Sequence, residues 1–205
     1  MNNNIDSYKT IKQASKEGLF KDKGSKFYGY AFPVTNEEEI KEKIELLKKQ
    51  HYNARHWCYA WQLGKKYDHY RANDDGEPSN SAGMPIYGQL QSFNVTNVLV
   101  VVVRYFGGTK LGVGGLIKAY KNGAKLALEN SIIIHKTIDE VFLIKFEYPE
   151  MNTIMRIIKD ENISIINQKM ELDCQFIISI RKKEAIRIFK IFENTYKVSI
   201  KVVKK

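Results

Sequence analysis

The sequence predicts a mixed α+β protein, of the α/β sandwich type, with two domains that cover residues 1–137 and 138–205. The run Val98–Val103 is apolar without alternation, which is typical of a central strand covered on both faces. Segments of helical period and of strand period follow one another along the chain. This succession begins again after Ile138, and a length of 205 residues suits two small domains.

Two strands and a helix are expected at the beginning of the chain. Lys9–Ala14 and Lys26–Val34 have strand patterns, and the lysine- and glycine-rich segment between them is typical of a hairpin. Thr35 to Glu38 matches the S/T-x-x-E pattern of a capping box. This pattern predicts a helix that runs to about Gln50.

The middle of the chain contains the remaining elements of the first domain. His56–Leu63 is predicted to be a strand rich in aromatic residues, and Gly64–Ser79 is polar enough to form a long loop. Ser81–Phe93 is predicted to be a helix, and the strand Val98–Val103 follows it. Leu116–Asn130 then has the pattern of an amphipathic helix.

The second domain has the predicted order strand–helix–strand–strand–helix–strand, which is the ferredoxin-like order. The predicted strands are Val141–Glu147, Ile163–Gln168, Cys174–Ile180 and an alternating strand over Val198, Ile200 and Val202. The predicted helices are Glu150–Glu161 and Lys182–Asn194.

The net charge points toward polyanionic partners. The chain carries 33 basic and 23 acidic side chains, a formal net charge of +10. Residues 1–138 hold 20 basic and 13 acidic side chains, so they carry +7 of this excess. A basic surface attracts nucleic acids. Frequent Lys, Asn and Ile would also result from an A/T-rich genome, and composition alone leaves both explanations open.

The cellular location expected from the sequence is the cytoplasm. No stretch is long and apolar enough to span a membrane, and no signal-peptide pattern is present. Cys58 and Cys174 lie in different predicted domains, so we expect two free thiols. We expect no membrane partner, and the cysteines lack the spacing of a zinc site.

An acidic loop holds the first group of candidate binding residues. Asp74, Asp75 and Glu77 could bind a cation or act as an acid/base pair, but Asp-Asp-Gly is also a turn whose side chains accept from its own amides. We favour the turn, and we expect neither a metal nor a cofactor. His56 is either a base or anion contact or a structural histidine. Ser79 lacks the nucleophile elbow of a serine hydrolase, and no catalytic residue is assigned.

A glycine-rich turn holds the second group. Arg104 and Lys110 flank it, and its glycines are Gly107, Gly108, Gly112, Gly114 and Gly115. A strand that feeds a glycine-rich turn and then a helix can expose backbone N–H groups to an anion. The same glycines could instead allow close packing between helix and strand. The sequence leaves these two roles open.

Together these segments resemble the IMPACT/YigZ family. The resemblance rests on the strings HWCYAW (56–61), DDGEPS (74–79), AGMP (82–85), RYFGG (104–108), LGVGGL (111–116) and AY (119–120). It covers roughly residues 15–130. It implies that the first domain is similar to domain 2 of ribosomal protein S5, and that the second is similar to the ferredoxin-like domain of bacterial members. Eukaryotic members of the family are translational regulators.

Two functions are compatible with these observations. The first is a non-catalytic RNA- or ribosome-associated protein, with a translation-associated protein as a further partner and a role in translation or stress regulation. The second is an enzyme that acts on a phosphorylated small molecule through the acidic loop and the glycine-rich turn. Trp57, Tyr59 and Trp61 share one strand face and could stack on bases if exposed, although burial in the core is expected for most of them.

Overall fold

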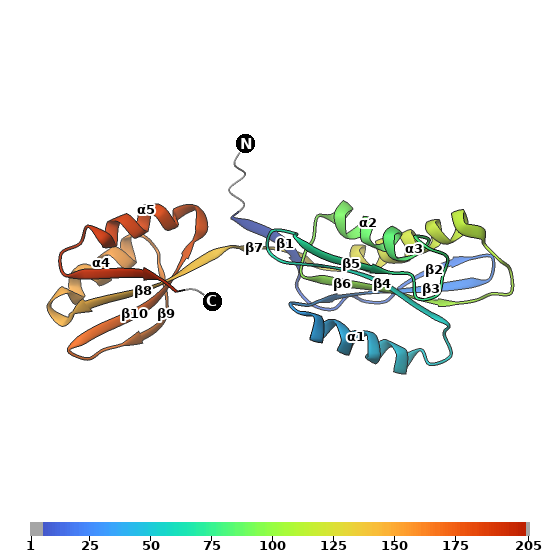
Figure 1. The fold of residues 1–205 in the computed structure, drawn as a ribbon, viewed down its shortest axis with the longest axis horizontal. Helices are drawn as coiled ribbons and strands as arrows, with labels where there is room; N and C mark the ends of the chain where they lie inside the picture. The colour runs from blue at the N-terminus through green and yellow to red at the C-terminus, as the bar shows by residue number, and fades with distance from the viewer. Residues whose placement is uncertain (1–5, 204–205) are drawn as a thin grey trace. The chain divides into compact units, whose positions relative to one another are not determined.

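The computed structural model describes residues 6–203 (Figure 1). The chain divides into two compact units. One is Tyr8–Lys136, here called the N-terminal unit. The other, the C-terminal unit, consists of Asp6, Ser7 and the described chain from Thr137 onward. Helices and strands are mixed in both units, so the protein belongs to the mixed α+β class that the sequence predicts.

The N-terminal unit is built around a five-stranded antiparallel sheet with the order β2-β3-β6-β4-β5. A second sheet pairs β1 with β7. The strands are β1 (Ser7–Ile11), β2 (Gly18–Asp22), β3 (Ser25–Pro33), β4 (His56–Leu63), β5 (His69–Asn73), β6 (Val98–Tyr105) and β7 (Ile133–Thr137). The helices are α1 (Glu37–Gln50), α2 (Gly83–Phe93) and α3 (Gly112–Glu129).

The central strand β6 separates two hydrophobic cores, and this explains why its sequence does not alternate. Val98, Val100 and Val102 belong to the core that includes residues of α2 and α3. Leu99, Val101 and Val103 belong to the core that includes residues of α1. Figure 1 shows α2 and α3 on one side of the sheet and α1 on the other. The predicted central strand with two covered faces is therefore confirmed.

Two glycines set the distance between α3 and the sheet. A Cβ atom added at Gly29 in β3 would lie 2.1 Å from the carbonyl oxygen of Gly123 in α3. A Cβ atom added at Gly123 would lie 3.0 Å from Cγ1 of Val102. The helix therefore packs against the strands at a distance that only glycine allows.

A hydrogen-bonded network lies on the α1 side of the sheet. The Tyr30 hydroxyl donates to Glu17 at 2.5 Å and lies 2.7 Å from Nε2 of His51. Because that hydroxyl has one hydrogen, Nε2 of His51 carries a proton and donates it to Tyr30. Nδ1 of His51 then accepts from the Tyr105 hydroxyl at 3.1 Å. Burial lowers the pKa of His51, and the nearby Glu17 opposes this effect.

Three local predictions require correction. Asn36, not Thr35, caps α1: its side chain accepts from the N–H of Glu39, and the Glu39 carboxylate reaches back to Thr35. The predicted loop Gly64–Ser79 contains the strand β5, which pairs with β4 at the edge of the sheet, so its polar exposed residues resemble a loop. The short strands β2 and β7 are also absent from the prediction.

The start of α3 was placed too late by the sequence pattern. The helix begins at Gly112, four residues before the predicted start. Glycine is a poor helix former, so the sequence Gly112-Val113-Gly114-Gly115 resembles a loop. In the structure these residues form the first turn of the helix.

The C-terminal unit contains a four-stranded antiparallel sheet with the order β11-β8-β10-β9. Its strands are β8 (Asp139–Glu147), β9 (Ser164–Lys169), β10 (Asp173–Arg181) and β11 (Val198–Val202). Its helices are α4 (Met151–Asp160) and α5 (Lys182–Glu193), with a short 3-10 helix at Tyr148–Glu150. One core joins the inner face of the sheet to both helices. The predicted order βαββαβ is confirmed, and its predicted boundaries differ by only one or two residues.

Within residues 6–203, no helix has both the length and the apolar character needed to cross a membrane.

Candidate functional site

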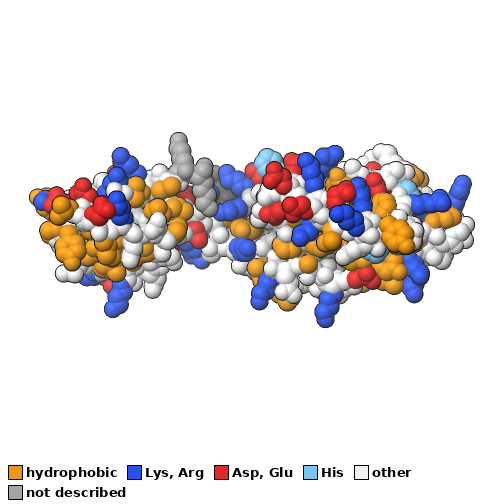
Figure 2. Space-filling model, turned by 90° about the horizontal axis from the view of Figure 1, so that it is seen from below, with side chains coloured by type: hydrophobic (Ala, Val, Ile, Leu, Met, Phe, Trp, Pro, Cys, Tyr) orange, Lys and Arg blue, Asp and Glu red, His pale blue; other side chains and the backbone are white. Residues whose placement is uncertain are grey.

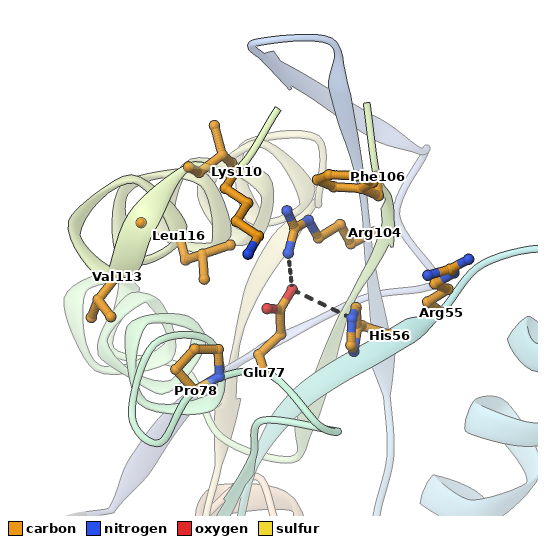
Figure 3. A pocket seen from close by; sticks show the side chains of 11 residues that line it. Arg55, His56, Glu77, Pro78, Arg104, Phe106, Lys110, Val113 and Leu116 are labelled. Atoms are coloured by element: carbon orange, nitrogen blue, oxygen red, sulfur yellow. Dashed lines mark hydrogen bonds and ion pairs between the residues drawn. The ribbon is translucent and has the colours of Figure 1, made fainter. Parts of the chain in front are cut away.

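A pocket of about 410 Å³ lies where the start of β4, the end of β6, the loop before α2 and the start of α3 meet (Figure 3). It is lined by Arg55, His56, Glu77, Pro78, Arg104, Phe106, Lys110, Leu111, Gly112, Val113 and Leu116. The acidic loop and the glycine-rich turn thus contribute to one pocket, although they are separated in the sequence. Its volume falls within the range of about 300–1,000 Å³ that is usual for small-ligand sites.

A buried ion pair joins the acidic loop to β6. Nη1 of Arg104 lies 2.6 Å from Oε1 of Glu77, and the two side chains are 8% and 4% exposed. The Arg104 guanidinium also contacts the rings of Phe27 and Phe106, at 5.6 and 5.5 Å from their centroids. Its Nε has no hydrogen-bond partner among the described residues. The charges of Arg104 and Glu77 offset each other in the pocket.

Two further buried groups support Glu77 and its loop. The Tyr120 hydroxyl donates to Oε1 of Glu77 at 2.7 Å, so this oxygen accepts from both Tyr120 and Arg104. The thiol of Cys58 donates to the carbonyl oxygen of Asp74 at 2.9 Å. Burial raises the pKa of the Tyr120 hydroxyl and of the Cys58 thiol, so both stay protonated at neutral pH.

His56 has a defined tautomer in this pocket. Its Nδ1 lies 2.8 Å from the carbonyl oxygen of Asp75, which can only accept, so Nδ1 carries a proton. Its Nε2 lies 4.0 Å from Oε1 of Glu77 (Figure 3). His56 therefore presents Nε2 to the pocket beside a buried carboxylate.

The other two acids of the loop have structural roles. Oδ1 of Asp74 accepts from the N–H groups of Ala82 and Gly83, and its Oδ2 accepts from that of Asn80. Asp74 thereby caps α2. Oδ2 of Asp75 accepts from the N–H of Trp57 at 2.6 Å, which ties the loop to the start of β4. Asp74 does begin a turn, since its carbonyl oxygen accepts from the N–H of Glu77 at 2.9 Å. The two carboxylates, however, accept from backbone N–H groups outside the turn and not, as had been expected, from its own amides. Neither lines the pocket.

Among residues 6–203, no group of three or more His, Cys, Asp or Glu side chains is arranged to hold a metal ion. Ser79 does not line the pocket, and the nearby Ser81 hydroxyl donates to the carbonyl oxygen of Pro78 at 2.6 Å.

The glycines of the turn have different roles. A Cβ atom on Gly107 would lie 1.9 Å from the backbone carbon of Gly24, so Gly107 packs against the β2–β3 turn. Gly108 and Gly112 have φ angles of +88° and +71°, which favour glycine. At Gly114 an added Cβ would meet no described atom within 4 Å. Of these glycines only Gly112 lines the pocket, and the close packing of helix on strand comes from Gly29 and Gly123 instead.

The mouth of the pocket is positively charged. Arg55 and Lys110 are exposed, and none of the ion pairs formed by the described residues involves them. The first turn of α3 contains no acidic residue. Its N-cap residue is Leu111, whose side chain cannot accept a hydrogen bond from the N–H groups of this turn. Such N–H groups attract anions. Over the face seen in Figure 2, by contrast, Lys and Arg side chains are dispersed and acidic groups lie between them.

Five of the eleven lining residues, here called the apolar wall, have larger apolar side chains: Pro78, Phe106, Leu111, Val113 and Leu116. Phe106 and Val113 are 49% and 53% exposed, and Figure 3 shows Phe106 across the pocket from Val113, Leu116 and Pro78. Sequence reasoning missed Arg55, Tyr120 and these apolar residues as parts of the site. Two of these residues could have been found from their neighbours in the sequence. Arg55 directly precedes His56, and Phe106 lies between Arg104 and the glycines. The aromatic residues Trp57, Tyr59 and Trp61 pack in the α1-side core instead.

These features define a mixed α+β protein whose N-terminal unit carries a pocket with a basic mouth and an apolar wall. Residues 23–128 match the Impact N-terminal domain. The chain belongs to the IMPACT family. It is 32% identical to the IMPACT family member YvyE of Bacillus subtilis over 88% of this chain and 82% of that protein. It is 35% identical to the IMPACT family member YigZ of Escherichia coli over 71% of this chain and 72% of that protein.

Two solved structures are also similar to this chain. The crystal structure of a hypothetical protein, 26% identical, matches with a TM-score of 0.71 and covers 98% of both chains. The two-domain translational regulator Yih1 is also 26% identical, over 58% of this chain and 46% of its own, with a TM-score of 0.36.

Proposed function

We propose that this chain is a non-catalytic RNA- or ribosome-associated protein that acts in the regulation of translation. The observation that carries the proposal is that Arg55, Lys110 and the start of α3 line the same pocket, and that α3 has no side-chain cap among the described residues. Positive side chains beside free backbone N–H groups are suited to phosphate. The excess of +7 over residues 1–138 supports a polyanionic partner.

The proposal includes the type of each domain. We propose that residues 1–137 form a domain similar to domain 2 of ribosomal protein S5, and that residues 138–205 form a ferredoxin-like domain. The order βαββαβ and the sheet order β11-β8-β10-β9 support the second assignment. The link to translation and to a translation-associated protein partner comes from the family, whose eukaryotic members regulate translation.

Salt-dependent binding tests this proposal. The association constant for a labelled single-stranded RNA can be measured by fluorescence anisotropy at several salt concentrations. If four to six phosphates are contacted, the logarithm of this constant should fall with the logarithm of the salt concentration at a slope of about −3 to −4. The double variant Arg55→Gln/Lys110→Gln should bind all sequences more weakly and flatten the slope by about 1.4. Arg104 is unsuitable for this test, because its removal would leave Glu77 buried without its ion-pair partner.

The matched control is Lys118→Gln/Lys121→Gln, which removes two exposed charges from helix α3 at positions that do not line the pocket. The control should alter the slope less than the pocket variant does. Binding that ignores salt, or a pocket variant that binds as the unaltered chain does, contradicts the proposal.

A second candidate is an enzyme that acts on a phosphorylated small molecule. The specific observation in its favour is that His56 and Glu77 share the pocket with Lys110 and the start of α3. Nε2 of His56 is placed to exchange a proton with a ligand held there. Turnover of a phosphorylated metabolite that is lost in His56→Gln would favour this candidate over the first. Asp74 and Asp75 are poor targets because they hold the loop together.

A further inference from the structure

The apolar wall of the pocket has no role in binding phosphate. Phe106 and Val113 leave about half of their surfaces exposed, and a folded chain gains nothing from that exposure. They line the same pocket as Arg55 and Lys110. A ligand that fits both sides must carry a negative group and a flat or apolar part.

Phe106 is held in place by the residue beneath it. The guanidinium of Arg104 lies 5.5 Å from its ring centroid, and Arg104 is 7% exposed and fixed by Glu77. Figure 3 shows Phe106 above Arg104, at the side of the pocket, with Lys110 across from them. The aromatic ring is therefore positioned although it is half exposed, which is what a stacking surface requires.

Arg104 itself is occupied in this pocket. It is nearly buried, its Nη1 is taken by Glu77, and its Nε is shielded from solvent and meets no acceptor among residues 6–203. The cation that lies across from Phe106 and forms no ion pair with another described residue is Lys110.

We propose that this pocket is a subsite for one nucleotide, with its phosphate at Lys110 and the first turn of α3 and its base against Phe106. The inference rests on the proposed function and makes it more specific. The nucleotide is either a free nucleoside phosphate or one unit of an RNA strand, and the two share the same chemistry.

The test is an NMR titration of the full chain with three probes: adenosine 5′-monophosphate, ribose 5-phosphate and adenosine. We expect the first two to shift the amide signals of Gly112–Gly115, because both carry the phosphate. Adenosine 5′-monophosphate should bind about tenfold more tightly than ribose 5-phosphate, because stacking on one aromatic ring is worth about that factor.

Two variants separate the parts of the ligand. Phe106→Leu should weaken adenosine 5′-monophosphate about tenfold and leave ribose 5-phosphate unchanged. Lys110→Gln should weaken both. The controls are Tyr52→Leu, which alters an aromatic residue that is 77% exposed outside the pocket, and Lys121→Gln; neither should change binding. Equal affinity for the two phosphates, unaltered by Phe106→Leu, would mean an anion site only and overturn the inference.

The same samples distinguish this inference from the proposed function. RNA binding that depends on salt but is untouched by Phe106→Leu, with no shift by adenosine 5′-monophosphate, overturns the subsite and leaves the function standing. Binding of the mononucleotide without RNA binding overturns the proposed function and leaves the subsite standing. In that case the ligand is a free nucleotide. A short RNA that binds more tightly than the mononucleotide, and is weakened by Phe106→Leu, identifies the RNA strand.

Discussion

The ion pair of Arg104 and Glu77 offers the sharpest test of the structure. Arg104→Met removes the guanidinium and keeps an apolar stem. Glu77, whose side chain is 4% exposed, would then keep only the Tyr120 hydroxyl as a donor among its described partners. Removal of one partner of a buried ion pair costs about 3–5 kcal/mol. We expect the free energy of unfolding of the N-terminal unit to fall by this amount.

Tryptophan fluorescence isolates that unit. The two tryptophans of the chain, Trp57 and Trp61, both lie in β4. Their signal therefore follows the unfolding of the N-terminal unit, and its Tm should fall by about 10–20 °C in Arg104→Met. Lys125→Met is the control: its partner Glu129 is exposed, so this pair is worth less than about 1 kcal/mol.

A double variant shows whether the cost comes from the unpaired carboxylate. Arg104→Met/Glu77→Leu should be less destabilised than the sum of the two single variants, with a coupling energy of about 1–3 kcal/mol. If Arg104→Met unfolds within about 1 kcal/mol of the unaltered chain, the buried pair described here is refuted, since exposed pairs alone cost so little.

Three further outcomes are expected. Gly107→Ala should destabilise the N-terminal unit by at least about 2 kcal/mol, because its Cβ would meet the backbone of Gly24. Gly114→Ala should instead stabilise this unit by about 0.5–1 kcal/mol. Equal free energies of unfolding for the two variants in chemical denaturation would contradict this expectation. Both cysteines are buried, so Ellman's reagent should react with neither thiol in the native protein and with both in guanidinium chloride; a fast native reaction would show that one is accessible. Burial lowers the pKa of His51 from its usual 6.5, so the unfolded chain binds more protons there. Stability should therefore fall as the pH falls from about 7 to about 5.5, and His51→Gln should lessen this fall in the same denaturation assay; equal slopes would exclude His51 as a cause.

Local patterns were enough to predict most of the fold. The limits of β4 agree with the predicted strand His56–Leu63, and the elements of the C-terminal unit were found from period alone. The strand β5 was missed because an edge strand with exposed polar residues has the composition of a loop. The start of α3 was missed because helix propensity opposes glycine, and tertiary contacts decided the outcome.

The candidate site was predicted as a set of segments but not as a set of side chains. The spacing of Asp74, Asp75 and Glu77 does not reveal which carboxylate the backbone N–H groups occupy. The answer depends on how the loop folds over α2 and β4. Asp74 bonds to the start of α2 and Asp75 to the start of β4, so of the three acids only Glu77 lines the pocket. The place of Arg104 at the end of a wholly apolar run was a sign in the sequence that it could be buried. In the structure, β6 is buried from Val98 through Arg104.

The glycine contacts of α3 bear on how quickly a ligand could bind. Gly123 fixes the body of the helix against Gly29, and Gly107 fixes the preceding turn against Gly24. The first turn of α3 lies between these two contacts, which fix the chain on either side of it. A pocket preorganised in this way loses little conformational entropy when it is occupied. Association should then proceed without a slow rearrangement step, and the backbone around the pocket should have nearly the same geometry when empty and when filled.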